Sequence, residues 1–234
     1  MQGLFDWSPM EEIKPIWLTE RVVVLYGDEI RVPPGEKLLP IRLEKSRVFG
    51  TGGHPATRAA VHAMNVALKR YFDDRMPPQV VELGNSTGLL ALIGAAAGAD
   101  WATLLTDDPA SAQIALENTV INDLVIEIGS PLQYFAPWSC VYQHGIPSVP
   151  ETDLLVTQCG GSEMARPWVE DVFASLAPGG VVVWAGHSSD HHHQIKHELE
   201  EWFHEATTYE FEGWPVLLAH KADPGPLRPE NQDK

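Results

Sequence analysis

Apolar, strand-like runs alternate with segments of helical spacing from about residue 54 to residue 220, and this alternation is what most constrains the fold. Segment 54–72 has the apolar spacing of a helix, with Pro55 in its first turn, where proline is tolerated. Buried-type strands separated by helices are typical of a mostly parallel sheet covered on both faces, so the sequence predicts an α/β fold. Strands are expected at 79–84, 101–106, 124–128, 152–157, 180–185 and 215–220, and further helices at 88–99, 109–123, near 162–176 and at 190–206.

Three stretches fall outside the alternation. Residues 1–50 contain RVVVLYGDEIRVPPGEKLLPIRLE, which predicts a short antiparallel β-ribbon with a Pro-Pro-Gly turn. Segment 129–150 is rich in proline and is expected to be a long loop, a kind of loop that is often functional. Residues 223–234 are polar and proline-rich, which indicates a disordered tail. The expected organisation is an N-terminal extension with a β-ribbon linker (1–50), one α/β domain (51–222) and the tail.

The stretch VVELGNSTGLLAL at 80–92 leads from a predicted strand directly into a predicted helix. Gly84 and Gly88 allow a tight turn and a close approach of the backbone to a ligand, and ligands of such sheets bind beyond the carboxyl ends of the strands. The spelling is E-x-G-x-S-x-G, with Ser86 where such loops usually carry another glycine. The loop is therefore a candidate cofactor site. A nucleotide-dependent oxidoreductase is disfavoured because the dinucleotide fingerprint G-x-G-x-x-G is absent.

The loop is followed by LLTD at 104–107, at the next strand end, and by ENTVIN at 117–122. This series resembles the class I S-adenosylmethionine-dependent methyltransferases. The segment FGTGGHPAT at 49–57, with the linker-like stretch 12–48 before it, resembles more specifically the bacterial ribosomal-protein methyltransferase family PrmA. The resemblance continues through LAPGG to FEGWPVLLAHK at 211–221, and the loop spelling is also similar to that of related protein-lysine methyltransferases.

This resemblance implies a Rossmann-like, seven-stranded class I methyltransferase fold in residues 51–222, with a mostly parallel sheet and one antiparallel strand. It also implies S-adenosylmethionine as the cofactor and a protein amine, of the lysine or N-terminal type, as the methyl acceptor. The PrmA family carries a separate N-terminal substrate-recognition domain ahead of the linker. Because the chain starts almost at the linker, we expect it to lack that domain, and the family's ribosomal substrate is not carried over.

Taken position by position, the resemblance places Thr57 near the methionine end of the cofactor, and Gly84 and Gly88 at the first and last glycines of the loop. Asn85 and Ser86 depart from the family, which has a small residue and a glycine there. A serine is tolerated at such a position if its φ is negative and is strained if its φ is positive. These five residues are expected to bind the cofactor.

The resemblance also implies a carboxylate at the end of the second strand, which accepts charge-assisted hydrogen bonds from both ribose hydroxyls. Ungapped counting from Gly84 puts Thr106 at this position, whereas alignment on LLTD puts Asp107 there, with Asp108 as the fallback. Alternatively, the two aspartates only begin the helix at Pro109, as acidic residues often do. We favour Asp107 and keep Thr106 as a second cofactor-binding candidate.

The strand at 152–157 is followed by Gln158, where the family has an asparagine that positions the accepting nitrogen. Glutamine keeps the amide but is one methylene longer, so its donor and acceptor atoms shift. Gln158 and Thr157 are the catalytic candidates. Aromatic residues supply further candidates, each of which is also compatible with ordinary packing: Phe5, Trp7 and Trp17 for the acceptor pocket, and Tyr134, Phe135 and Trp138 for the adenine.

Composition narrows the possible partners and the compartment. The chain has 32 acidic and 16 basic residues, a net charge of −16, which disfavours nucleic acid and suits a basic protein, although acidity can also serve solubility alone. No apolar run approaches the roughly 20 residues of a membrane helix, and the acidic N-terminus lacks the layout of a signal peptide. Two cysteines are too few for a disulfide framework, so a cytoplasmic location is expected.

Other chemically active residues are weaker candidates. In DHHHQIKHELEEWFH at 190–204, His193 and His197 share one helical face, a spacing that suits a metal. An exposed polar helix face is the stronger interpretation, and no metal site is expected. Cys159 lacks a nearby histidine, which disfavours a thiol nucleophile. His54 is expected near the cofactor or as a helix cap.

Two functions of different classes are compatible with these residues. The first is an S-adenosylmethionine-dependent methyltransferase, indicated by FGTGGHPAT and the glycine loop. The second is a catalytically inactive protein of the same fold that serves as a binding or assembly partner. The departures at Ser86, Thr106 and Gln158, within an otherwise retained scaffold, motivate the second hypothesis.

Overall fold

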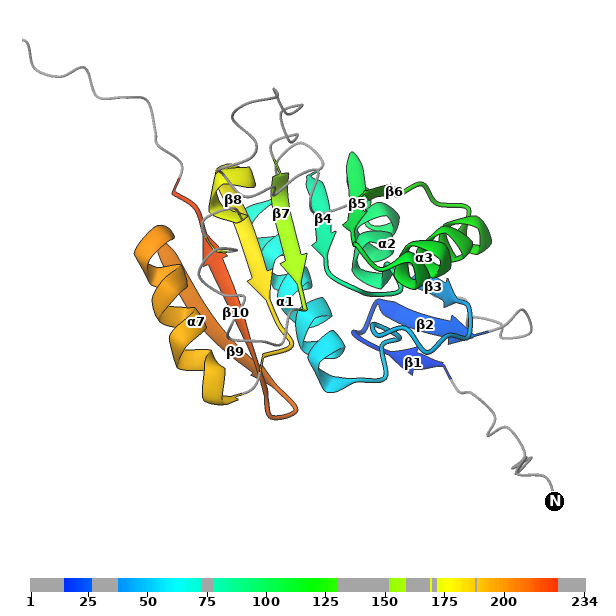
Figure 1. The fold of residues 1–234 in the computed structure, drawn as a ribbon, viewed down its shortest axis with the longest axis horizontal. Coiled ribbons are helices and arrows are strands. Elements are labelled where there is room, and N and C mark those ends of the chain that lie inside the picture. Colours follow the sequence, from blue (N-terminus) through cyan, green and yellow to red (C-terminus); the bar gives the residue numbers. More distant parts are fainter. Residues whose placement is uncertain are drawn as a thin grey trace, which may run out of the picture.

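A seven-stranded sheet forms the centre of the molecule in the computed structural model, which describes residues 15–26, 38–72, 78–129, 152–158, 169, 172–187 and 189–222 (Figure 1). The strand order is β6-β5-β4-β7-β8-β10-β9. Neighbours from β6 to β8 pair in parallel, and β10 pairs antiparallel with both β8 and β9, which confirms the predicted fold with one antiparallel strand. The strands are β4 (Gln79–Leu83), β5 (Trp101–Leu105), β6 (Glu127–Gly129), β7 (Thr152–Thr157), β8 (Leu176–Trp184), β9 (Glu205–Phe211) and β10 (Trp214–His220).

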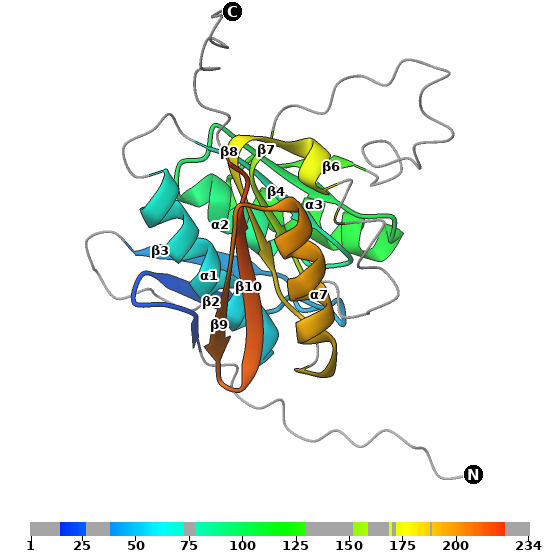
Figure 2. The same ribbon diagram turned by 90° about the vertical axis from the view of Figure 1, so that its left-hand side faces the viewer.

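Helices cover both faces of this sheet. On one face lie α1 (Pro55–Tyr71), α2 (Leu89–Ala96) and α3 (Pro109–Asn122), and on the other lies α7 (Ser189–Trp202). Figure 2 shows α1 and α7 on opposite sides of the β9–β10 hairpin. Along β8, Val181 and Val183 face the first group of helices while Val182 and Trp184 face α7, as the two-residue period of a strand requires.

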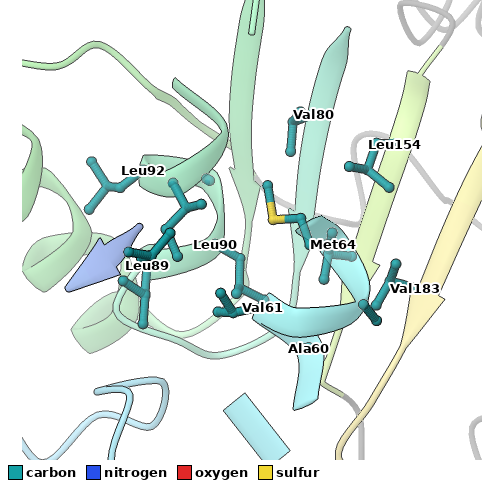
Figure 3. Packing of buried hydrophobic residues seen from close by; sticks show 14 of the residues in the cluster. Ala60, Val61, Met64, Val80, Leu89, Leu90, Leu92, Leu154 and Val183 are labelled. Atoms are coloured by element: carbon teal, nitrogen blue, oxygen red, sulfur yellow. The ribbon is translucent and has the colours of Figure 1, made fainter. Parts of the chain in front are cut away.

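The larger core lies between α1, α2 and the sheet (Figure 3). Ala60, Val61 and Met64 repeat at helical spacing on α1, and small alanines among them let the helix approach the strands closely. Complete burial of a side chain such as Leu90 stabilises the fold by roughly 2 kcal/mol. Figure 3 shows these side chains converging with Leu89 and Leu92 of α2 and with Val80, Leu154 and Val183 of three strands.

A second, three-stranded sheet precedes the central one and packs beside α2 and α3. It consists of β1 (Ile16–Trp17), β2 (Val22–Tyr26) and β3 (Leu39–Leu43). The prediction of an antiparallel ribbon within RVVVLYGDEIRVPPGEKLLPIRLE is wrong for β2 and β3, which pair in parallel. The antiparallel partner of β2 is β1, which lies before the predicted ribbon. The connection over residues 27–38 has the length of a crossover rather than of a hairpin. The Pro-Pro-Gly sequence lies outside the described residues.

The side chains of two asparagines on α3 complete the outer edge of β3. Asn122 accepts a hydrogen bond from the Arg42 N–H and donates one to the Arg42 carbonyl, both 2.7 Å long. Asn118, one turn earlier, accepts from the Glu44 N–H at 2.8 Å. Residues four apart on a helix lie on one face, so the ENTVIN spacing matches the edge of this strand. The edge is thereby paired without a fourth strand.

Most predicted elements are confirmed, with three differences. The strand expected at 124–128 is β6, which begins later because Asp123 adopts a left-handed conformation and the Leu124 N–H still bonds the Thr119 carbonyl of α3. The helix expected at 190–206 ends at Trp202, and β9 was not predicted. The helix expected near 162–176 lies largely outside the described residues. None of the helices in the described ranges has the length and apolar character that a bilayer crossing requires.

Candidate functional site

The glycine loop joins β4 to α2 at the edge where the parallel strands end. Gly84 and Gly88 both have a positive φ, 135° and 77°, which side chains disfavour. A Cβ on Gly88 would also lie 3.0 Å from the Cβ of Ala115 on α3. The two glycines therefore let the chain turn straight from the strand into the helix, as the sequence predicted.

Ser86 is accommodated in this loop without strain. Among the described residues, the non-glycine residues with a positive φ are Asp123 and Glu212, so Ser86 is not one of them. Its side chain is 3% exposed, and its hydroxyl donates to Glu82 Oε1 at 2.5 Å and accepts from the Gly88 N–H at 3.1 Å. The hydroxyl thus points inward, away from the outer face of the loop.

Glu82 is the buried anchor of the loop. Its side chain is 1% exposed, and its second oxygen accepts a hydrogen bond from the Ala91 N–H in the first turn of α2 at 2.9 Å. Burial raises the pKa of this carboxyl group, although the bonds from Ser86 and Ala91 act in the opposite direction. Glu82 was not a predicted site residue, and its position beside the glycines in E-x-G is the signal that could have identified it.

The FGTGG segment packs directly against the glycine loop. The Thr87 N–H donates to the Phe49 carbonyl at 2.9 Å, and the Thr87 hydroxyl donates to the Gly50 carbonyl at 2.7 Å. A Cβ on Gly50 would lie 3.2 Å from the Cβ of Ser86, so glycine at position 50 leaves room for the serine. The Tyr26 hydroxyl bonds the Thr51 carbonyl and ties the segment to β2.

Asn118 links the same loop to the N-terminal sheet. Its side-chain amide donates to the Thr87 carbonyl at 2.9 Å while its oxygen accepts from Glu44, as described above. The residue is completely buried. One side chain therefore sets the distance between β3 and the glycine loop, a role that the sequence pattern alone did not reveal.

The end of β5 holds the three ribose candidates in different environments. Thr106 donates to Asn85 Oδ1 at 2.9 Å and so joins the glycine loop. Asp108 caps α3, accepting from the Ser111 hydroxyl and the Ser111 N–H, and these bonds lower the pKa of its carboxyl group. Asp107 is exposed between them. The helix-start interpretation therefore holds for Asp108, whose carboxylate is engaged in the cap.

Thr57 and Gln158, 101 positions apart, meet at this edge. The Thr57 hydroxyl, in the first turn of α1, donates to Gln158 Oε1 at 2.9 Å. Gln158 follows β7, and its backbone is so close to Gly186 that a Cβ there would lie 2.7 Å from the Gln158 carbonyl oxygen. Thr157 is buried, and its carbonyl accepts from the Ala185 N–H. The longer glutamine side chain is thus held at its end.

A row of aromatic rings extends from the glycine loop to the start of β10. The Phe49 and His54 rings are 5.3 Å apart between centroids, and the His54 and Trp214 rings are 4.7 Å apart. His54 caps α1, because its Nδ1 accepts a hydrogen bond from the Ala56 N–H at 3.1 Å. Phe49 and Trp214 were not predicted as site residues, although both lie in segments that carried the family resemblance.

Other predicted candidates lie elsewhere or outside the described residues. Trp17 is on β1 and half exposed. Buried His187 bonds His192, and this burial lowers its pKa to about 4. No group of three metal-ligating side chains occurs in the part of the chain that the structure describes. The candidates outside the described residues are Phe5, Trp7, Tyr134, Phe135, Trp138 and Cys159.

A cavity of about 300 Å³ lies at the opposite edge of the sheet. It is lined by α1, the C-terminal end of α2 and the N-terminal sheet, with Met64, Phe72 and Pro78 among its walls. Pro78 lies just before β4, whereas the glycine loop lies just after β4. The cavity and the candidate site are therefore at opposite ends of this strand and are separate.

Comparison with known families and relatives identifies the group of proteins that this chain resembles. The family described as "Ribosomal protein L11 methyltransferase (PrmA)" matches residues 5–222. A ribosomal protein L11 methyltransferase of Pelobacter propionicus is 27% identical over 191 residues, covering 77% of this chain and 55% of that protein. One from Nitrosomonas europaea is 24% identical over 233 residues, covering 94% and 68%. The chain thus spans little more than half of the Pelobacter relative.

Solved structures show the same fold. A crystal structure of ribosomal protein L11 methylase from Lactobacillus delbrueckii subsp. bulgaricus superposes with a TM-score of 0.69 at 20% identity, covering 89% of this chain and 98% of that one. A 16S rRNA N2 G1207 methyltransferase of T. thermophilus, solved with AdoMet and guanosine, has a TM-score of 0.56 at 26% identity, covering 74% and 45%.

Proposed function

Because the chain belongs to the ribosomal protein L11 methyltransferase (PrmA) family, we propose that it transfers a methyl group from S-adenosylmethionine to an amine of a protein. The observation that carries the proposal is the hydrogen bond between Thr57 and Gln158, beside a glycine loop whose outer face is free of the Ser86 hydroxyl. It brings a residue of α1 and the residue that follows β7 together at the strand edge where such sheets bind ligands.

The residues present fit the cofactor. Gly84 and Gly88 leave backbone without side chains at the turn, and Ser86 directs its hydroxyl to Glu82 instead of outward. In our proposal Asn85 and Thr106, which bond each other, border the nucleoside, and Asp107 accepts hydrogen bonds from the ribose hydroxyls. Thr57 lies toward the methionine end. When bound, the cofactor supplies an electrophilic methyl group on a positively charged sulfur.

The role of Gln158 is to orient the accepting nitrogen, with Thr157 holding the backbone of the strand end. A displacement requires the nucleophile to be aligned, and a misplacement of about 1 Å can reduce the rate about a hundredfold. Since Thr57 holds Gln158 Oε1, the extra methylene does not leave the amide free to swing. The second lone pair of Oε1 remains available to accept a hydrogen bond from the amine.

The proposed acceptor is a lysine or N-terminal amine of a basic protein, and ribosomal protein L11 is the first substrate to test. The net charge of −16 favours a basic protein over RNA as the partner. We place the activity in the cytoplasm, where ribosomal proteins are made. The alternative, a non-catalytic binding protein of this fold, was motivated by the departures from the family at Ser86, Thr106 and Gln158. Each of these residues has a hydrogen-bond partner within the site, so the departures support this alternative less than the sequence suggested.

Two measurements test the proposal. Titration calorimetry of the purified protein with S-adenosylmethionine should show saturable binding, which Gly84→Arg abolishes. Gly98→Arg is the matched control, since Gly98 also has a positive φ but lies at the far end of α2. Mass spectrometry of L11 incubated with protein and cofactor should show added methyl groups. No binding of cofactor by the unchanged protein would refute the proposal, and binding of L11 without methylation would favour the non-catalytic alternative.

A further inference from the structure

The cavity at the opposite edge of the sheet is lined by one stripe of α1 that is apolar on one side and polar on the other. The lining residues of this helix recur at intervals of three and four, so they share one face: Val61, Met64, Asn65, Leu68, Lys69 and Phe72. The polar pair, Asn65 and Lys69, lies one turn apart along one side of the stripe. The helix therefore gives the cavity an apolar surface with a cation beside it.

The exposure of the lining residues distinguishes the deep end of the cavity from its mouth. Val61 and Met64 of α1 and Ile93 of α2 are at most 3% exposed, so they form the floor. Lys69 and Gly98 are exposed, and a Cβ added to Gly98 would meet no atom within 4 Å. An apolar group therefore fits at the floor, and a charged group fits at the mouth near Lys69.

A second cation lines the cavity from the N-terminal sheet. Arg21 lies just before β2, where its backbone N–H donates to Thr19 Oγ1 at 3.1 Å and its carbonyl accepts from the Leu39 N–H at 2.7 Å. Arg21 and Lys69 are the charged residues among the described residues of the lining, and none of these residues is acidic. In a chain with 32 acidic and 16 basic residues, two cations without a carboxylate around one cavity favour an anion.

The end of α2 leaves this volume unfilled because its residues are small. Gly94 packs so closely on β4 that a Cβ there would lie 3.0 Å from Val80 Cγ1, and the next lining residues are Ala97, Gly98 and Ala99. The cavity measures about 300 Å³. An engineered cavity of about 150 Å³ binds benzene, so by this scaling the present one accepts roughly 10–12 non-hydrogen atoms.

We infer that this cavity binds a small carboxylate with an apolar body, with the body between α1 and α2 and the carboxylate between Lys69 and Arg21. Arginine matches the two oxygens of a carboxylate, and the alkyl stems of both side chains extend the apolar wall. Apolar walls with a few polar groups are typical of small-molecule sites. Because the cavity and the glycine loop are at opposite ends of β4, this inference does not rest on the proposed function.

Calorimetry with three eight-carbon ligands tests the charge preference. Octanoate is the carboxylate, octanamide is its neutral isostere, and octylammonium carries the opposite charge. Octanoate should bind saturably with a dissociation constant of about 0.1–1 mM, octanamide roughly 3- to 20-fold more weakly, and octylammonium more weakly still. The net charge of −16 attracts cations to the protein as a whole, so a preference for the anion indicates a local site.

Variants assign the binding to the cavity. Lys69→Gln and Arg21→Gln should each weaken octanoate binding about 2- to 5-fold with little change for octanamide, whereas Lys196→Gln, which removes a cation from α7, should change neither. Ala97→Phe places a ring at the cavity wall, where a φ of −78° accepts any side chain, and should weaken both ligands about tenfold or more. Ala110→Phe, at an exposed alanine of α3, is the matched control.

NMR of protein with labelled methionine methyl groups locates the ligand. Octanoate should shift the Met64 resonance, which Met64→Leu assigns, and should do so equally in Gly84→Arg, where the proposed cofactor site is blocked. The inference is overturned if octanoate does not bind saturably, if octylammonium binds at least as tightly, or if the Met64 resonance does not move. An equal loss of affinity in Lys196→Gln, or loss of octanoate binding in Gly84→Arg, would also contradict it.

Discussion

Replacing Ser86 with alanine should destabilise the protein markedly, although the family usually has glycine there. The change removes the hydroxyl that donates to buried Glu82 at 2.5 Å and accepts from the Gly88 N–H. A hydrogen bond to a charged group contributes about 1.5–3 kcal/mol and a neutral one about 1 kcal/mol, so the free energy of unfolding should fall by about 2–4 kcal/mol. For a domain of this size the melting temperature should fall by roughly 4–16 °C.

The dependence on pH makes this prediction specific to Glu82. Burial raises its pKa in the folded protein, so its stabilising contribution is complete below the unfolded pKa and is lost as the pH rises through the folded pKa. Ser86→Ala removes a bond that favours the charged form and raises the folded pKa further. The difference in stability between Ser86→Ala and the unchanged protein should therefore be smallest near pH 4.5, where the lost bond from the Gly88 N–H accounts for about 1 kcal/mol, and grow as the pH rises.

Urea unfolding monitored by circular dichroism at several pH values provides the measurement. Ser175→Ala is the matched control, because its buried hydroxyl donates at 2.8 Å to the neutral carbonyl of Val172. That variant should lose about 1 kcal/mol at every pH. The reasoning is wrong if the loss in Ser86→Ala does not exceed that in Ser175→Ala, or if it does not change with pH.

Three further predictions concern the surroundings of the site. Thr57→Val should lower the rate of methyl transfer in single-turnover assays about tenfold or more, because valine lacks the hydroxyl that holds Gln158, whereas Thr57→Ser keeps it and should retain most activity. Equal rates in the two variants would exclude this role. Asn118→Ala should reduce stability by about 1–3 kcal/mol and weaken cofactor binding in calorimetry, since it loses its bond to Thr87, and unchanged binding would contradict the link. His187, whose pKa burial lowers from 6.5 to about 4, should remain neutral in NMR titrations from pH 8 to pH 5. Its contribution to stability is complete above the unfolded pKa of 6.5 and should be lost as the pH falls from there to about 4; an NMR midpoint near 6.5 would refute the burial argument.

Local patterns were sufficient for most of the fold. The helix at 54–72 and the strands at 79–84 and 152–157 were predicted nearly to their ends, because their apolar spacing and Pro55 act over a few neighbouring residues. Strand β9 was missed because EATTYEF is an edge strand with partly exposed residues and little apolar content, so its pairing with β10 shows only once the hairpin has formed.

The sequence by itself determined the α/β architecture, the turn at Gly84 and Gly88, and the family to which the chain belongs, since periodicity, backbone freedom and motif spelling are properties of short segments. Only the tertiary structure decided the parallel pairing of β2 with β3, the inward bond from Ser86 to Glu82, and the engagement of Asp108 in a helix cap. It alone joined Thr57 to Gln158 and aligned Phe49 with Trp214. These contacts link residues far apart in the chain, and they form only when the strands that carry them share one sheet edge.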